Sequence, residues 1–156
     1  MSVDELVQDL RNGLGMVRVN AAVELGKLND KRAESALIDA LRDSNMAVRN
    51  NAAFALGELC SRAAVPGLLA LLHDPEERVR KSAVKALGMI KAGECVSSLI
   101  QLLETDTSHV VKKSAIRSLG QINGPRALSA VEPFVSHPDT TLSTAAKKAV
   151  EMMSKG

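Results

Sequence analysis

The feature that most constrains the fold of this chain is a twelve-residue pattern that recurs four times. VRKSAVKALGMI at residues 79–90 is closely matched by VKKSAIRSLGQI at 111–122, and more loosely by VRVNAAVELGKL at 17–28 and VRNNAAFALGEL at 48–59. Its glycines are separated by 31, 31 and 32 residues: Gly26, Gly57, Gly88 and Gly120. A fixed period of this length indicates one supersecondary unit stacked many times.

Each unit contains two helical patterns joined by a turn. In VRKSAVKALGMI the apolar residues recur at the spacing of one helix face, as they do in the upstream segment VPGLLALLHD at 65–74. Neither helix can bury its apolar face alone, so neighbouring units must stack. We therefore predict an all-α solenoid of five helix pairs forming a single domain over residues 1–156, with repeats at about 1–29, 30–60, 61–91, 92–123 and 124–156.

The repeated glycine predicts how closely the units pack. A glycine inside a helix costs about 1 kcal/mol relative to alanine, so four placements at one position indicate close approach of the next unit. The fifth repeat has Glu151 at that position, and Lys147 and Glu132 at positions that are apolar in the other repeats. We expect repeat 5 to be a polar cap that completes the array.

Two segments carry signals for the start of a helix. Ser2 and Glu5 have the spacing of a capping box, in which each side chain binds the backbone N–H of the other residue. Asp74-Pro75-Glu76-Glu77 has a similar pattern, which predicts Asp74 as the N-cap and Pro75 as the first helical residue.

The unit Asp-(x4)-Val-Arg-x-x-Ala-Ala-x-Ala-Leu-Gly-x-Leu, preceded by a Leu-x-x-Leu-Leu helix, resembles HEAT repeats, and more specifically the short prokaryotic type called PBS-lyase HEAT-like repeats. The resemblance covers essentially the whole chain. It implies a right-handed superhelix whose concave face is lined by the second helix of each pair. Members of the family include interaction scaffolds, phycobilin lyase subunits and a few enzymes.

The resemblance also assigns a role to the periodic charged residues. The motif's acid falls on Asp43, Asp74 and Asp106, and its arginine on Arg18, Arg49 and Arg80, whereas Lys112 and Ser143 replace the arginine in repeats 4 and 5. The family implies a structural ladder of caps and salt bridges between units rather than a catalytic site.

The remaining composition argues against several functional classes. The chain is 46% hydrophobic and 24% charged, with a net charge of +2, so the molecule as a whole does not indicate a nucleic-acid or membrane partner. No run of about 18 apolar residues is present, and the start MSVDELVQDL lacks the features of a signal peptide. We expect a cytoplasmic monomer that is not an enzyme. The three histidines fall in separate turns and no phosphate-binding loop occurs, so no metal or cofactor is predicted.

Candidate binding residues are the variable positions of the second helices, because constant positions build the stack. Repeats 1 and 2 offer apolar and amide groups, and repeats 3 to 5 offer a row of cations that we call the basic stripe, together with one methionine. The apolar and amide group is Val19, Val23, Asn50, Asn51 and Phe54; the basic stripe is Lys81, Lys85, Lys113, Arg117 and Lys148; the methionine is Met89. The sequence leaves open whether the stripe is a binding site or a solvated face, and whether Phe54 is exposed.

These features predict a non-catalytic protein-binding scaffold that holds a protein partner with an acidic segment. Nucleic acid is a less favoured partner. Single-strand binding commonly uses aromatic side chains, and none accompany the lysines, although contact with duplex phosphates needs none. A phycobilin or chromophore lyase-type subunit is the second alternative, and it rests on the family resemblance alone.

Overall fold

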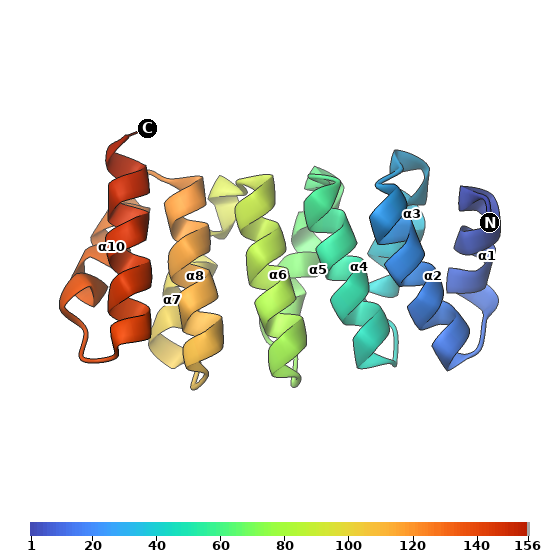
Figure 1. Ribbon diagram of the computed structural model, residues 1–156, viewed down its shortest axis with the longest axis horizontal. Helices are drawn as coiled ribbons and strands as arrows, with labels where there is room; N and C mark the ends of the chain where they lie inside the picture. Colours follow the sequence, from blue (N-terminus) through green and yellow to red (C-terminus); the bar gives the residue numbers. More distant parts are fainter. Residues whose placement is uncertain (156) are drawn as a thin grey trace.

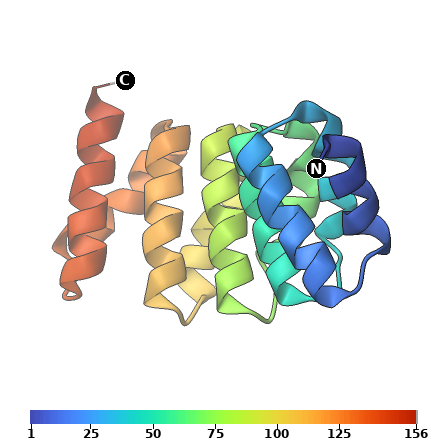
Figure 2. The same ribbon diagram turned by 45° about the vertical axis from the view of Figure 1, so that its right-hand side comes forward.

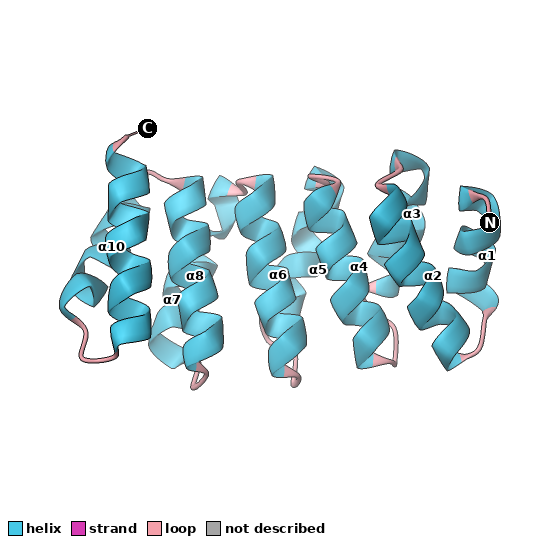
Figure 3. Ribbon diagram, in the orientation of Figure 1, coloured by secondary structure: helices cyan, strands magenta, loops and turns pink. Residues whose placement is uncertain are grey.

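The computed structural model describes residues 1–155, and this part of the chain is helical with no strand (Figure 3). The helices are α1 (Val3–Asn12), α2 (Gly15–Leu28), α3 (Glu34–Ala40), α4 (Met46–Glu58), α5 (Val65–Leu71), α6 (Glu77–Ile90), α7 (Val96–Thr105), α8 (His109–Ile122), α9 (Pro125–Val131) and α10 (Thr140–Ser154). Short 3-10 turns precede α3, α5 and α7, and a fourth one, Glu132–Ser136, follows α9.

The helices form an α-solenoid of five antiparallel pairs, as the repeat predicts. The second helices, α2, α4, α6, α8 and α10, stand side by side in one layer; α5 and α7 lie behind them, and α1 lies beside α2 at the N-terminal end (Figure 1). We call the outer surface of this front layer the second-helix face. The tilt of α2 against α10 is visible after rotation (Figure 2), so the row of helices twists along its length.

The constant apolar residues of the repeat form the core between the two layers. In α6, Val79, Ala83 and Leu87 are completely buried. In α5, the first helix of the same repeat, Leu68 is completely buried, and Leu72, which directly follows this helix, is 2% exposed. The apolar face of each helix is therefore covered by its partner helix and by the neighbouring repeats, which is what the amphipathic pattern predicts.

The prediction that the glycines permit close packing is confirmed most clearly at two repeats. A Cβ atom on Gly57 would lie 2.9 Å from Ala86 Cα, and one on Gly120 would lie 3.2 Å from Ala149 Cα. Both contacts are with the backbone of the next second helix. At Gly26 the space is wider, because the nearest atom, Ala55 Cβ, would be 3.4 Å away.

The predicted ladder of salt bridges is also confirmed. Arg18 pairs with Asp43 at 2.8 Å, Arg49 with Asp74 at 2.9 Å, and Arg80 with Asp106 at 2.8 Å, each across one repeat junction. Each carboxylate also accepts a hydrogen bond from the backbone N–H two residues later in its own turn. These pairs therefore fix both the turn and the junction.

The junction between repeats 4 and 5 uses a different pair. At this junction Lys112 stands in place of the arginine and His137 in place of the aspartate, and neither forms an ion pair within residues 1–155. Instead, His109 Nδ1 lies 2.7 Å from Asp139 Oδ2. Asp139 also caps α10 by accepting hydrogen bonds from the N–H groups of Thr141 and Leu142.

The two predicted helix starts have different outcomes. The capping box of Ser2 and Glu5 is present as predicted. The prediction at Asp74 is wrong, because α6 begins at Glu77 and its N-cap is Glu76. The Asp74 side chain instead pairs with Arg49 and accepts a hydrogen bond from the Glu76 N–H. It therefore takes part in the salt-bridge ladder and does not cap α6.

The two ends of the solenoid differ in polarity. Lys147 and Glu132 are exposed in repeat 5. In repeat 1, by contrast, Val17 is 41% exposed although its equivalents Val48 and Val79 are completely buried. None of the helices within residues 1–155 combines the length and the apolar character needed to cross a bilayer.

Candidate partner-binding surface

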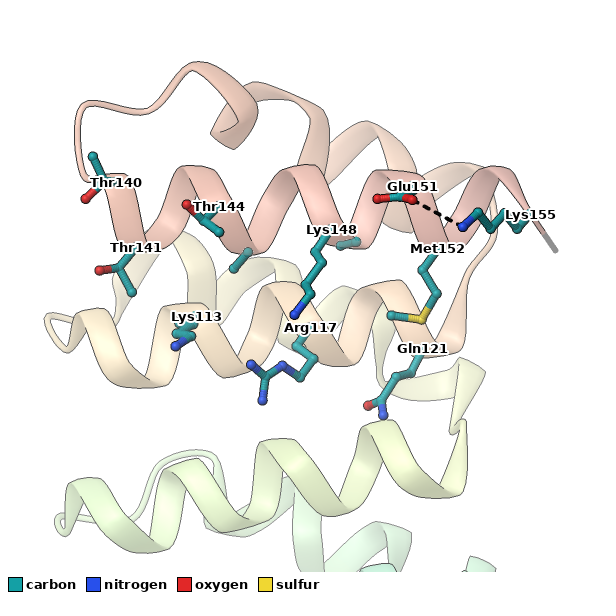
Figure 4. Close-up of a pocket in the computed structure, with 12 residues that line it drawn as sticks. Lys113, Arg117, Gln121, Thr140, Thr141, Thr144, Lys148, Glu151, Met152 and Lys155 are labelled. Carbon is teal, nitrogen blue, oxygen red and sulfur yellow. Dashed lines mark hydrogen bonds and ion pairs between the residues drawn. The ribbon is translucent and has the colours of Figure 1, made fainter.

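The second-helix face is hollowed along its C-terminal half. Of three hollows on this half of the face, the largest has a volume of about 780 Å³; it lies between α8 and α10 and is lined by Lys113, Arg117 and Lys148 among others. Figure 4 shows Lys148 and Met152 extending from α10 toward α8, and Arg117 and Gln121 extending from α8 toward α6. Cationic and uncharged side chains thus alternate across this part of the surface.

Two smaller hollows continue the same surface toward the N-terminus. One of about 380 Å³ is lined by four cations, Lys81, Lys85, Lys113 and Arg117. The other, of about 180 Å³, is lined by Phe54 and Met89 together with Lys85, Arg117 and Gln121. Arg117 lines all three hollows, and we call the three together the basic groove.

Within residues 1–155, the five cations of the basic stripe have no ion-pair partner, whereas Lys155 at the C-terminal end of the groove pairs with Glu151. Burial lowers the pKa of the Lys85 ammonium, and the nearby charges of Lys81, Arg117 and Lys113 lower this pKa further. The groove therefore holds like charges close together, which an anion would relieve.

The structure brings together seven of the eleven residues predicted from the sequence. Phe54, Lys81, Lys85, Met89, Lys113, Arg117 and Lys148 line the groove. Phe54 is 51% exposed, so it is not tucked between the helices. The open question about this side chain is thereby answered.

The other four predicted residues do not line the groove. Val19 and Val23 are half-buried in α2, outside its hollows. Asn51 donates a hydrogen bond to the Ala47 carbonyl of its own helix, and Asn50 accepts one from Ser82 Oγ at 2.5 Å. The asparagine side chains therefore serve the stack as well as the surface, which residue type alone does not reveal.

Several groove residues were not selected from the sequence. Thr140, Thr141 and Lys155 line the largest hollow, as does Glu151, which accepts a hydrogen bond from Lys155 at 3.1 Å. The first two and Glu151 lie on α10, where the repeat pattern is weakest, and Lys155 directly follows this helix.

Two observations within residues 1–155 concern side chains that could take part in catalysis. No group of three or more histidine, cysteine or acidic side chains within residues 1–155 has the arrangement of a metal site. Burial raises the pKa of the Cys95 thiol to about 11, and the charge of Glu94 adds to the shift, so this thiol is protonated at neutral pH.

Comparison with protein families settles the class of the solenoid. The model for HEAT repeats matches residues 3–88 and 65–151. The chain belongs to the HEAT-repeat family. The basic groove is thus a surface formed by the second helices of HEAT repeats 2 to 5, and the Arg–Asp pairs are the rungs that join these repeats.

Solved structures extend this assignment. The chain is similar to a chain of the complex of CpcE and CpcF of phycocyanin lyase from Nostoc sp. PCC7120, with 31% identity and a TM-score of 0.88. The alignment covers 100% of this chain and 66% of that chain, so this protein spans slightly less than two thirds of its relative.

More distant similarities concern the fold alone. A designed armadillo repeat protein in complex with the peptide (KR)4 gives a TM-score of 0.79 at 24% identity, covering 97% of this chain and 81% of that one. Human deoxyhypusine hydroxylase gives 0.68 at 19% identity, covering 99% and 74%. Among proteins of curated function, none matches the sequence.

Proposed function

We propose that this protein is a non-catalytic adaptor that holds an acidic segment of a protein partner in the basic groove. The observation that carries the proposal is the clustering of five cations, none of them ion-paired within residues 1–155, around the adjoining hollows of the basic groove. A charged side chain on an ordinary solvated helix face is free to move away from like charges. Lys85 is half-buried and its pKa is lowered, so its repulsion from the neighbouring cations is not fully screened by water.

The rigidity of the solenoid supports the same role. The second helices are held by the Arg–Asp rungs and by side-chain bonds such as Ser118 Oγ to the Val84 carbonyl, at 2.8 Å. The cations therefore stand on a framework that is organised before any partner arrives. Preorganisation reduces the entropy lost on binding and so increases affinity.

The proposal is tested by fluorescence anisotropy with a labelled polyglutamate peptide and a purified monomer. We expect micromolar binding that weakens as salt is added. The charge-reversed variant Lys85→Glu/Arg117→Glu should bind at least about 10-fold more weakly. The matched control Lys31→Glu/Lys147→Glu changes the net charge equally with exposed lysines outside the groove, and it should bind like the wild type.

Two results would count against this function. Equal affinity of both double variants would show that net charge, and not the groove, attracts the peptide. Tighter binding of a short DNA duplex than of the peptide, with a steep dependence on salt, would favour phosphate-backbone recognition instead.

A second function is supported by one comparison. The 31% identity to a chain of a phycocyanin lyase complex favours a subunit of a two-chain lyase-type assembly. In that case the basic groove would bind the carboxylates of a tetrapyrrole, and Phe54 and Met89 would contact its apolar rings. Addition of a bilin should then shift its visible absorption spectrum, and the shift should be lost in Lys85→Glu/Arg117→Glu. An unchanged spectrum with the wild type would rule out this use of the groove.

A further inference from the structure

The 180 Å³ hollow is more apolar than the other two hollows of the basic groove. It lies where α4, α6 and α8 meet. Phe54 and Met89 supply an aromatic ring and a thioether, and Lys85 and Arg117 supply two cations. Phe54 is 51% exposed, and it is one of only two phenylalanines in a chain without tyrosine or tryptophan.

The repeat places this hollow at one end of the charged row. The position of Phe54 in repeat 2 corresponds to Val23 in repeat 1, Lys85 in repeat 3, Arg117 in repeat 4 and Lys148 in repeat 5. Along the solenoid this row therefore changes from apolar to cationic between α4 and α6. A ligand lying across the helices would meet the phenylalanine first and the cations afterwards.

On the basis of the proposed function, we infer that Phe54 and Met89 form an anchor for one large apolar side chain at one end of the acidic segment. The hollow is large enough for one such side chain. Methionine is well suited to this role because its flexible, polarisable side chain adapts to different partners. Aromatic residues commonly contribute most of the binding energy of an interface.

The dimensions of the groove suit this ligand. Packed helices lie about 8–10 Å apart, and a segment in polyproline II conformation rises about 9 Å in three residues. An apolar residue in the anchor thus lies beside Lys85 and Arg117, and an acidic residue about three positions away lies near Lys148, one helix further on. The groove has cations along its length and an apolar site at one end. The ligand that matches it is therefore an acidic peptide with one apolar residue near one end.

The test compares two labelled polyglutamate peptides that carry either a single leucine or a single alanine at one end. A second pair has the same residue at the opposite end, because either chain direction fits the groove. With the wild-type protein, we expect the leucine peptide of one pair to bind about 5- to 10-fold more tightly than its alanine counterpart. Phe54→Ser/Met89→Ser should remove this preference and leave the affinity for the alanine peptide nearly unchanged.

Two controls keep the result interpretable. Met16→Ser removes an apolar side chain that is 68% exposed and lies in α2, outside the groove, and it should retain the preference for leucine. Phe54→Leu keeps an apolar wall and should retain most of it. Circular dichroism confirms that each variant has the helicity of the wild type.

The outcomes separate the anchor from the proposed function. Equal binding of leucine and alanine peptides by the wild type would overturn the anchor and leave acidic-segment binding intact. A leucine preference that survives in Phe54→Ser/Met89→Ser would also overturn it. If the wild type binds neither peptide, the anchor and the proposed function both fail.

Discussion

Arg80 and Asp106 join repeats 3 and 4 through an ion pair of 2.8 Å between Nε and Oδ2, in which the arginine side chain is 17% exposed and the aspartate 4%. The same guanidinium donates a hydrogen bond to the Asp74 carbonyl in its own turn. One side chain thus links two consecutive turns, and the same arrangement recurs at Arg18 and Arg49.

Removal of Arg80 should therefore destabilise the protein. In Arg80→Ala the carboxylate of Asp106 stays almost buried without its cation, and we expect the free energy of unfolding to fall by about 2–3 kcal/mol. Urea denaturation followed by circular dichroism measures the change. The control Arg62→Ala removes an exposed pair with Glu94, whose side chains are 63% and 51% exposed, and should change stability by less than about 0.5 kcal/mol. Equal losses in the two variants would contradict the structural role of the ladder.

The helical glycines should respond differently to alanine. Gly57→Ala forces a Cβ to within 2.9 Å of the Ala86 backbone, and we expect it to lower stability by about 1–3 kcal/mol. Gly26→Ala meets only Ala55 Cβ at 3.4 Å, so the better helix propensity of alanine should make it neutral or stabilising by up to about 1 kcal/mol. Melting temperatures of the two variants provide the comparison. The reverse order would contradict close packing at Gly57.

These two cases show why the solenoid was predictable. In a repeat protein the same pattern occurs several times, so each interpretation can be checked at several positions. The same stacked architecture was indicated by the apolar spacing around Val79, by Gly57 and by the ion pair of Arg49. Each of these positions is constrained by contacts that recur with the period of the chain. The start of α6 was not predictable, because the side chain of Asp74 had two competing uses and the sequence does not rank them.

The candidate surface was only partly predictable for a related reason. The basic stripe follows from helix periodicity, but the exposure of Phe54 depends on the space between α4, α6 and α8. That space is set by the twist of the stack, which local patterns do not contain. Asn50 and Asn51 occupy helix positions that the sequence pattern predicts to face outward. Their hydrogen bonds to Ser82 and to the Ala47 carbonyl follow only from the three-dimensional structure.

Lys85 should cost stability in the free protein. Its pKa is lowered from 10.5, so the folded state holds the proton less tightly than the unfolded chain. The charged form therefore destabilises the fold at neutral pH, and this penalty is relieved as the pH rises through the folded pKa toward 10.5. We expect Lys85→Met to raise the melting temperature at pH 7, with a gain that shrinks near pH 10, while weakening peptide binding. A lowered melting temperature would contradict the repulsion inferred here.

The stability contributed by the junction between repeats 4 and 5 should decrease at acid pH. The N–H of Leu142 and the hydrogen bond with His109 hold the pKa of Asp139 below its usual value. A lowered acid pKa stabilises the fold above the unfolded pKa of about 4, and this contribution is lost as the pH falls through the folded value. Asp139→Asn keeps a capping side chain without the charge. Its melting temperature should lie below that of the wild type at pH 6, and the difference should shrink below about pH 4. A constant difference would exclude this titration.

The central claim is that the basic groove binds an anionic segment, and chemical-shift mapping by NMR tests it most directly. The isotope-labelled protein is titrated with the leucine-containing polyglutamate peptides, and backbone amide shifts are followed along the chain. The account predicts changes concentrated in α6, α8 and α10 around Lys85, Arg117 and Lys148, extending to Phe54 in α4. Changes confined to the first helices, such as α5 and α7, or no saturable changes at all, would contradict it.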